Sequence, residues 1–351
     1  MNEFIFNGQA SGAVATRLLA NDFNVHCLRP YIGQDGRTYI TTNVGGKLRG
    51  VPTNNAIATL RKDDWKQLDL AIVKAAMPRL KAVADLRSMG LTYNVPNGMG
   101  KTILETERMS DVNDATISMD GLREGADDRP HFDLLTLPLP IIHKDFSFSA
   151  RQIAASRSGG TPLDTSMAEA SGRKVAEEAE KLLLGVSSSY SYGGGVIYGY
   201  TNFPSRITKT ITSPVASGWT GQTLLTEILD MRALSVAKYH YGPWMMYTAP
   251  NWSQYLDTDF STSKGSNTVR ERIQKVDGIT DIRTLDYLED YDIVMVQMTT
   301  DIVREVIGMD ITTLQWETNG GMLVHYKVMA ILVPQLRADF NSNTGIVHGG
   351  V

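Results

Sequence analysis

One short segment carries residue types that could bind phosphate, the run Gly98-Met99-Gly100-Lys101-Thr102. In a phosphate loop, the backbone amides of a glycine-rich turn cradle phosphate oxygens and the lysine adds positive charge. That loop requires a glycine five residues before Gly100, where this sequence has Val95, and no apolar helix follows Thr102. The segment is therefore interpreted as a turn, and no nucleotide or other cofactor is expected.

Other reactive residue types lack the spacing that chemistry needs. His26 and Cys27 are adjacent, so in an extended segment their side chains point to opposite sides and cannot act as base and nucleophile. The six histidines are scattered along the chain without metal-ligand spacing,. Asp301, Glu305 and Asp310 are expected to be solvated charges or helix caps. The sequence thus predicts no catalytic residue, no metal and no enzyme.

The composition limits the class of protein to which the chain can belong. The chain has 351 residues, of which 42% are hydrophobic, enough for a real core and for two or three domains. Its formal charge of -4 excludes a coat that neutralises nucleic acid, but not a wall that merely confines DNA. A single cysteine favours a reducing compartment, and neither a secretory signal nor a membrane segment is visible.

The middle of the chain predicts two strands, a turn and a long helix. Apolar residues from Pro138 lead into the alternating segment up to Arg151, and then into a turn at Gly159-Gly160-Thr161-Pro162,. A charged helix is expected from about 164 to 184, because Ser166 and Glu169 have capping-box spacing and Gly185 follows.

Two segments are too poor in apolar residues to fold alone. Residues 1–60 are rich in Gly, Asn and Thr, and we interpret them as an arm that orders mainly against a neighbour, although an ordinary flexible terminus fits equally. Residues 90–132 alternate polar and apolar positions and predict a protruding hairpin, which is at best marginally stable without a cover. Both segments indicate self-assembly.

The remaining residues predict a mixed α/β region. Trp65, Leu68 and Ile72 recur at helical spacing after the N-cap candidates Asp63 and Asp64,. Further on, a helix is expected from Thr220, a strand at 244–248, a buried strand at 291–298, and a long strand at 322–333 before a glycine-rich tail.

Three blocks in order resemble the Hong Kong 97-type capsid fold, shared by tailed-phage major capsid proteins and encapsulins. They are the helix at 61–69, the turn and helix at 161–164, and the segment 242–247 with its continuation to Leu256. The resemblance covers about residues 61–335 and lies close to the encapsulin-like branch. The long stretch before Trp65 is the main departure from encapsulins and favours a virion protein.

The resemblance implies an α+β chain with an N-terminal arm, an extended loop, a peripheral domain with a spine helix, and an apical domain. The expected divisions are an arm at 1–60, the first peripheral helix at 61–89, the extended loop hairpin at 90–132, the peripheral domain at 133–217, the apical domain at 218–297, and the peripheral return strands and tail at 298–351. Charged residues of the loop are candidate contacts between subunits because they can set register: Lys101, Glu105, Arg108, Arg123, Glu124 and Asp128.

The leading hypothesis is a major capsid protein that forms pentamers and hexamers of an icosahedral shell around double-stranded DNA, bound without sequence specificity. It places the protein in the virion capsid, assembled in the host cytoplasm, with portal, scaffold and decoration proteins as further partners. The alternative is an encapsulin-type shell around a cargo enzyme, and a third is a soluble enzyme with an unrecognised site. No lysine–asparagine crosslink is predicted, since no matching asparagine can be placed.

Overall fold

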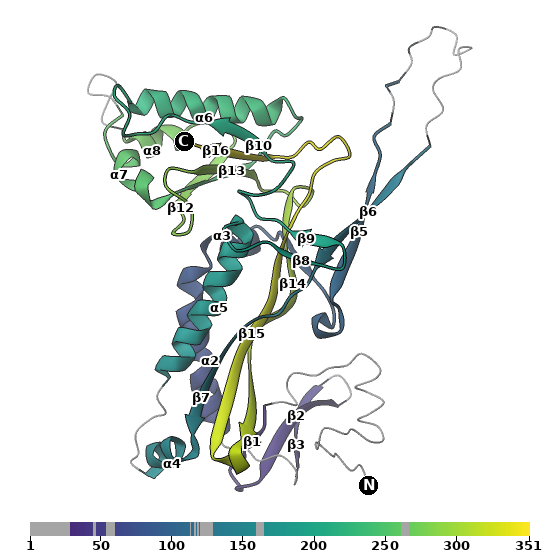
Figure 1. Cartoon of the computed structure of the whole chain (residues 1–351), viewed down its shortest axis with the longest axis vertical. Helices are drawn as coiled ribbons and strands as arrows, with labels where there is room; N and C mark the ends of the chain where they lie inside the picture. The colour runs from purple at the N-terminus through teal and green to yellow at the C-terminus, as the bar shows by residue number, and fades with distance from the viewer. Residues whose placement is uncertain are drawn as a thin grey trace.

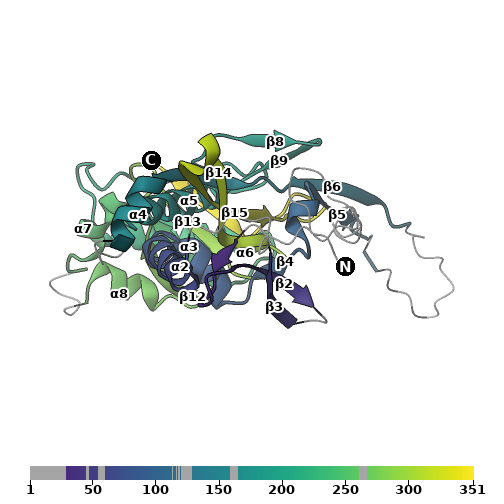
Figure 2. The same ribbon diagram turned by 90° about the horizontal axis from the view of Figure 1, so that it is seen from below.

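The computed structural model of the chain describes residues 29–44, 47–53, 60–112, 114–115, 117, 119, 129–158, 165–260 and 267–351. Figure 1 shows an elongated molecule with an upper module of sheet and helices, a lower module built on a long helix and a long β-ribbon, and a two-stranded hairpin that projects to one side. Seen from below in Figure 2, the hairpin points away from the body. The predicted α+β class is confirmed.

Within the part of the chain that the structure describes, four helices lie in the lower module, and the longest follows the sequence prediction closely. Their bounds are α2 Lys62–Ala76, α3 Lys81–Ser88, α4 Ala150–Ser158 and α5 Ser166–Leu184, with the 3-10 turn η2 Met77–Arg79 between the first two. Helix α5 ends at Gly185, whose φ of 86° only glycine adopts without strain,. The predicted start at Asp164 lies outside the described residues.

A four-stranded sheet packs against α5, in the order β4-β14-β15-β7. Its strands are β4 Thr92–Asn94, β7 Ile142–Ser149, β14 Val303–Thr318 and β15 Leu323–Leu336, and the turn η5 Asn319–Gly321 joins the last two. Val324, Tyr326 and Val328 are fully buried on the side that faces the helices. Tyr326 stacks on Phe146 at 5.2 Å and meets Trp65 of α2 edge-on at 5.9 Å. This cluster accounts for the large aromatic side chains at Trp65 of α2 and Phe146 of β7, which pack against Tyr326,.

The upper module is a five-stranded sheet in the order β10-β16-β13-β11-β12. Its strands are β10 Ile207–Thr210, β11 Trp244–Thr248, β12 Ile279–Thr284, β13 Ile293–Gln297 and β16 Ile346–Gly350. Its helices are α6 Gly221–Val236, η4 Pro250–Trp252, α7 Ser253–Leu256 and α8 Val269–Gln274. Every residue of β11 and β13 is buried. Both predicted strands are therefore present, and the predicted burial of the second is confirmed.

The C-terminal residues differ from the prediction of a glycine-rich tail grouped with the lower strands. Residues 346–350 form β16, which lies between β10 and β13 in the upper sheet. Ile346 and Val347 are fully buried there, and Gly349 fits beside Met231, whose sulfur would lie 3.3 Å from an added Cβ. The glycines that led to the prediction of a tail instead allow β16 to pack closely against α6,.

The hairpin begins and ends later than the predicted 90–132. Its strands are β5 Ile103–Met109 and β6 Phe132–Pro138, paired from Ile103 with Pro138 to Met109 with Phe132. Residues 92–94 instead pair with β14 in the lower sheet, because the flanking Leu91 and Val95 are buried. A short hairpin, β8 Tyr190–Tyr192 with β9 Gly195–Ile197, lies against β6.

The described part of the predicted arm is folded on its own chain. It forms a three-stranded sheet of β1 Tyr31–Ile32, β2 Thr38–Val44 and β3 Lys47–Pro52. The indole N–H of Trp65 donates to the carbonyl of Pro30 at 3.0 Å, and the guanidinium of Arg29 lies 4.6 Å from the centre of the same ring. The described residues 29–44 and 47–53 thus contact their own chain through Arg29 and Pro30, and the ordering of the arm by a neighbour stays a prediction. Residues 1–28 lie outside the described residues.

Candidate assembly surfaces

The hairpin exposes apolar side chains on both of its faces. A two-stranded ribbon has no third layer to cover it, so alternation along each strand leaves apolar groups in solvent whichever way they point. Ile117 and Met119 are almost fully exposed. Others are at least two-fifths exposed, namely Met109, Val112, Phe132, Leu134 and Leu135. Contiguous exposed apolar groups of this kind mark an interaction surface.

Charge is distributed unevenly between the hairpin and the lower module. Residues 103–138 contain nine carboxylates against three arginines, whereas residues 29–81 contain ten lysines and arginines against four aspartates. On the sheet face turned away from α5, Lys327 pairs with Asp145 at 3.6 Å and lies 5.7 Å from the ring of Trp316. Trp316 is partly exposed and stacks on His325 at 5.1 Å. The molecule thus carries an acidic, apolar limb and a basic body with an exposed aromatic.

The predicted contact residues are only partly brought together. Lys101 lies at the base of the hairpin, after the 3-10 turn η3 Gly98–Gly100, and is exposed. Glu105 is exposed on β5. Arg123, Glu124 and Asp128 lie outside the described residues.

Arg108 is engaged within its own chain rather than offered to a neighbour. Its guanidinium pairs with Asp133 across the hairpin at 3.1 Å and donates to the carbonyl of Asp339 at 3.0 Å. It also lies 5.5 Å from the ring of Phe340. Asn341 adds a hydrogen bond to Asp111 at 3.1 Å. These contacts fasten the outer end of the paired strands, around Arg108 and Asp133, to residues 339–341, which lie in the loop that Figure 1 shows between β15 and β16.

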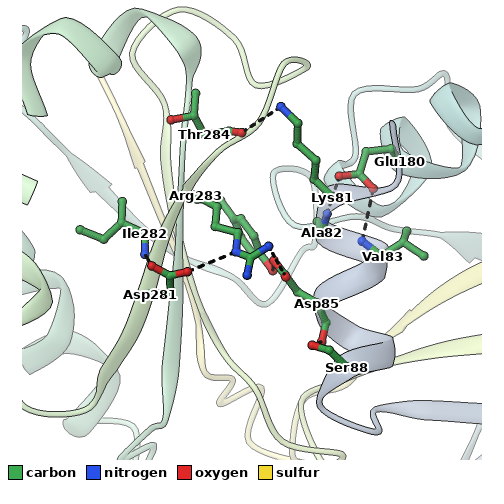
Figure 3. Close-up of polar contacts among 11 residues, drawn as sticks. Lys81, Ala82, Val83, Asp85, Ser88, Glu180, Asp281, Ile282, Arg283 and Thr284 are labelled. Atoms are coloured by element: carbon green, nitrogen blue, oxygen red, sulfur yellow. Dashed lines mark hydrogen bonds and ion pairs between the residues drawn. The ribbon is translucent and has the colours of Figure 1, made fainter. Parts of the chain in front are cut away.

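A second set of polar contacts joins the two modules around α3 (Figure 3). Asp85 pairs with Arg283 of β12 at 2.9 Å and accepts a hydrogen bond from the Tyr247 hydroxyl at 3.2 Å. Lys81 pairs with Asp286 at 3.0 Å. Asp85 is only 3% exposed, and its burial raises its pKa while Arg283 opposes that rise,. The joint is therefore polar, buried at Asp85 and open to solvent at Lys81, Asp286 and Arg283.

Helix α3 also binds the spine-like α5 and the long ribbon. Glu180 of α5 accepts hydrogen bonds from the backbone N–H groups of Ala82 at 2.7 Å and Val83 at 3.3 Å. Arg87 donates twice to Glu305 of β14, at 2.7 and 3.0 Å. Sequence analysis assigned Glu305 to solvated charges or caps; this is wrong, since it is 2% exposed and paired. The apolar residues on either side of Glu305, Val303 and Val306, were the signal in the sequence that this position is buried.

Nothing in the described residues supports the rejected chemistry. Gly98 packs against the backbone of Gly308, where an added Cβ would lie 2.3 Å from the carbonyl oxygen, so the glycine serves packing and not phosphate binding. Within those residues, no three His, Cys, Asp or Glu side chains gather as a metal site would need. His26 and Cys27 lie outside them. None of the helices described is long and apolar enough to cross a membrane.

Comparison with known proteins places this architecture. The chain belongs to DUF6260, a family of unknown function, which matches residues 54–349. No curated protein matches the sequence. The structure is similar to a virus-like particle from Pyrococcus furiosus, with a TM-score of 0.59 and 13% identity over 82% of this chain and 99% of that one.

Two further solved structures share the arrangement. The capsid of Myoviridae phage XM1 has a TM-score of 0.56 at 9% identity, over 71% of this chain and 85% of that one. The capsid of an empty GTA particle has a TM-score of 0.50 at 12% identity, over 77% and 90%. At such identities the likeness establishes the fold: this chain has the Hong Kong 97-type capsid fold.

Proposed function

We propose that this chain is the major capsid protein of a tailed bacteriophage, a shell subunit that forms pentamers and hexamers of an icosahedral capsid around double-stranded DNA. The observation that carries the proposal is the hairpin of β5 and β6, a projecting limb on which Met109, Phe132, Leu134 and Leu135 stay at least two-fifths exposed. Copies of the same chain are the partner that such a limb fits, because the solved structures that share this fold are those of a virus-like particle and a phage capsid, and most assemblies repeat one chain through the same contact.

Charge complementarity supports the lower module of the adjacent copy as the surface that receives the limb. An acidic hairpin attracts the basic lower module of the adjacent copy, and Trp316 and Lys327 there offer an aromatic and a cation to its apolar and acidic residues. Lys101, Glu105, Arg123, Glu124 and Asp128 remain the contact candidates, since charged residues along the limb set its register on the neighbour. The net charge of -4 leaves DNA confined without specific recognition.

The hairpin's own register supplies the test. Met109 is paired with Phe132, so replacing residues 110–131 by Asn-Gly closes a two-residue hairpin and keeps both strands. We expect the full chain to form closed particles by negative-stain electron microscopy and light scattering, and the shortened chain to remain a folded subunit that closes none.

A matched control replaces residues 110–131 by a Gly/Ser segment of equal length, which keeps the reach and removes the charged and apolar groups. It should also fail to close shells. A full chain that stays monomeric at every concentration and salt tried contradicts the proposal, and so do intact shells from the shortened chain.

An encapsulin-type shell around a cargo enzyme is the second candidate. It is favoured by the match to 99% of the chain of the Pyrococcus furiosus particle. The contents of native particles separate the two candidates. Nucleic acid inside supports the virion, for which portal, scaffold and decoration proteins are the further expected partners and the host cytoplasm is the expected place of assembly. A protein cargo inside supports the nanocompartment. A soluble enzyme would form no particle.

A further inference from the structure

Two Asn-Gly steps lie in the described part of the chain, and their surroundings differ. Asn97-Gly98 packs beside β14 in the lower module, and Asn319-Gly320 forms the tip of the ribbon of β14 and β15. In both steps the asparagine has a φ of 54°, which lies in the left-handed region that asparagine tolerates better than most residues. A third step, Asn7-Gly8, lies outside the described residues.

An asparagine followed by glycine can lose its side-chain amide without an enzyme. The backbone nitrogen of the glycine attacks the side-chain carbonyl carbon, so that a new C–N bond forms. The bond to the amide nitrogen breaks, and ammonia leaves with the proton of the attacking nitrogen. Water then opens the cyclic imide at either carbonyl and gives aspartate or isoaspartate. Glycine permits the attack best because it has no side chain to hinder it.

The attack requires rotation about ψ of the asparagine, which brings the next nitrogen up to the side chain. The Asn97 step is held against such a movement, since Gly98 is buried and a Cβ on it would lie 2.3 Å from the carbonyl oxygen of Gly308. Asn319 and Gly320 are exposed, and a Cβ on Gly320 would meet no atom within 4 Å. The ribbon tip can therefore reach the reactive geometry, whereas the packed step must first open locally.

We propose that Asn319 is a self-modifying site: its side-chain amide is lost to the backbone nitrogen of Gly320, and the uncharged tip of the ribbon acquires a carboxylate. The turn itself explains why these two residue types stand there, because Asn-Gly suits a turn with positive φ at both positions. The same pair is the one most open to cyclisation. The inference goes beyond the proposed function, since the reaction takes place within a single chain.

The product changes the surface around the tip in two ways. It adds a negative charge near Glu317, whose carboxyl oxygen lies 3.5 Å from where a Cβ on Gly321 would stand. Isoaspartate also lengthens the main chain by a methylene group, directly after Thr318. Thr318 is hydrogen-bonded to His325 at 2.8 Å, and His325 stacks on Trp316 at 5.1 Å. The modification thus reaches the exposed aromatic of the lower module.

Peptide mass spectrometry of the full chain, incubated at mildly alkaline pH, tests the reaction. Conversion replaces an amino group by a hydroxyl and so raises the mass of the peptide. Asn319 should convert roughly tenfold or more faster than Asn97, because the packed step must open locally before it reacts. The matched control is the same chain unfolded in urea, in which both steps should convert at similar rates.

Two results overturn the proposal. One is equal conversion of Asn319 and Asn97 in the folded chain. The other is an Asn319 that stays an amide when folded although it converts in urea. Neither result depends on a variant, so a folding failure cannot obscure them.

A consequence for assembly rests on the proposed function. A carboxylate at the tip repels an acidic limb that approaches Trp316, so Asn319→Asp should form particles roughly two- to threefold more slowly at low salt than Asn319→Gln. Equal rates contradict this consequence. A chain that forms no particles contradicts the proposed function, and the peptide analysis still decides the modification.

Discussion

Two buried carboxylates, Glu180 and Glu305, set the electrostatics around α3 in different ways. Glu180 meets backbone donors, whereas Glu305 meets the guanidinium of Arg87, which also pairs with Asp310 at 3.2 Å. Burial raises the pKa of Glu305, and Arg87 counteracts the rise,. A paired buried charge adds little net stability, but one that has lost its partner is costly.

Replacing Arg87 by alanine should therefore lower the free energy of unfolding by about 3 kcal/mol at pH 8. The loss should be smaller at pH 5, because the pKa of Glu305 rises further without Arg87 and the folded chain then takes up a proton more readily. Denaturant unfolding at the two pH values measures both effects.

The double variant Arg87→Met with Glu305→Gln is the control, since it removes the unpaired charge and should recover much of the stability. An equal loss at both pH values would show that Arg87 acts through packing and not through charge.

At the scale of elements, the crossing of α2 and α5 determines how closely the lower module packs. Gly172 lies in the middle of α5, and a Cβ there would stand 2.7 Å from the Cγ2 of Ile72 and 3.0 Å from its carbonyl oxygen. A glycine inside a helix costs about 1 kcal/mol relative to alanine. Gly172 offsets this cost by allowing the backbones of α2 and α5 to approach each other closely.

Gly172→Ala should destabilise the chain by about 1–3 kcal/mol, because the overlap with α2 outweighs the gain in helix propensity. Thermal or denaturant unfolding gives the value. Combining it with Ile72→Ala should produce a favourable coupling energy in a double-mutant cycle, since the second change removes the methyl group that clashes. Stabilisation by Gly172→Ala alone would mean that the helices can move apart freely.

At the scale of the whole molecule, the loop at 339–341 and α3 fix how its three parts are held. Arg108 links the hairpin to the end of β15, and β16 continues from there into the upper sheet. The direction of the limb is thus tied to the upper module. In the proposed shell, that connection aims an acidic limb at a basic neighbour.

Assembly should consequently be faster at low salt, because the Debye length shrinks from about 10 Å at 0.1 M to about 3 Å at 1 M. Reversing two exposed charges of α2, Lys66→Glu with Lys74→Glu, should slow particle formation at low salt, followed by light scattering, and the difference should vanish at high salt.

Lys238→Glu with Lys275→Glu, two exposed charges in the upper module, is the matched control with the same change in net charge and should have a smaller effect. Equal slowing by both changes would indicate that net charge, and not the lower module, governs association.

The sequence by itself determined the local elements. Periodic apolar residues with a terminal glycine defined the helix that became α5, and continuous apolar runs defined β11 and β13, because these signals arise within one segment. The sequence of residues 103–138 is poor in large apolar residues and alternates polar with apolar positions. The hairpin could therefore be predicted, although the predicted bounds of 90–132 differ from those observed.

Only the tertiary structure decided which distant residues meet. Glu305 is buried because Arg87, 218 positions earlier, reaches it, and Arg108 is turned inward by Asp339, 231 positions later. The glycine-rich C-terminal segment became β16 because the upper sheet offered a place between two strands. Pairings of this kind depend on how separate elements dock, and no pattern within either segment records its partner.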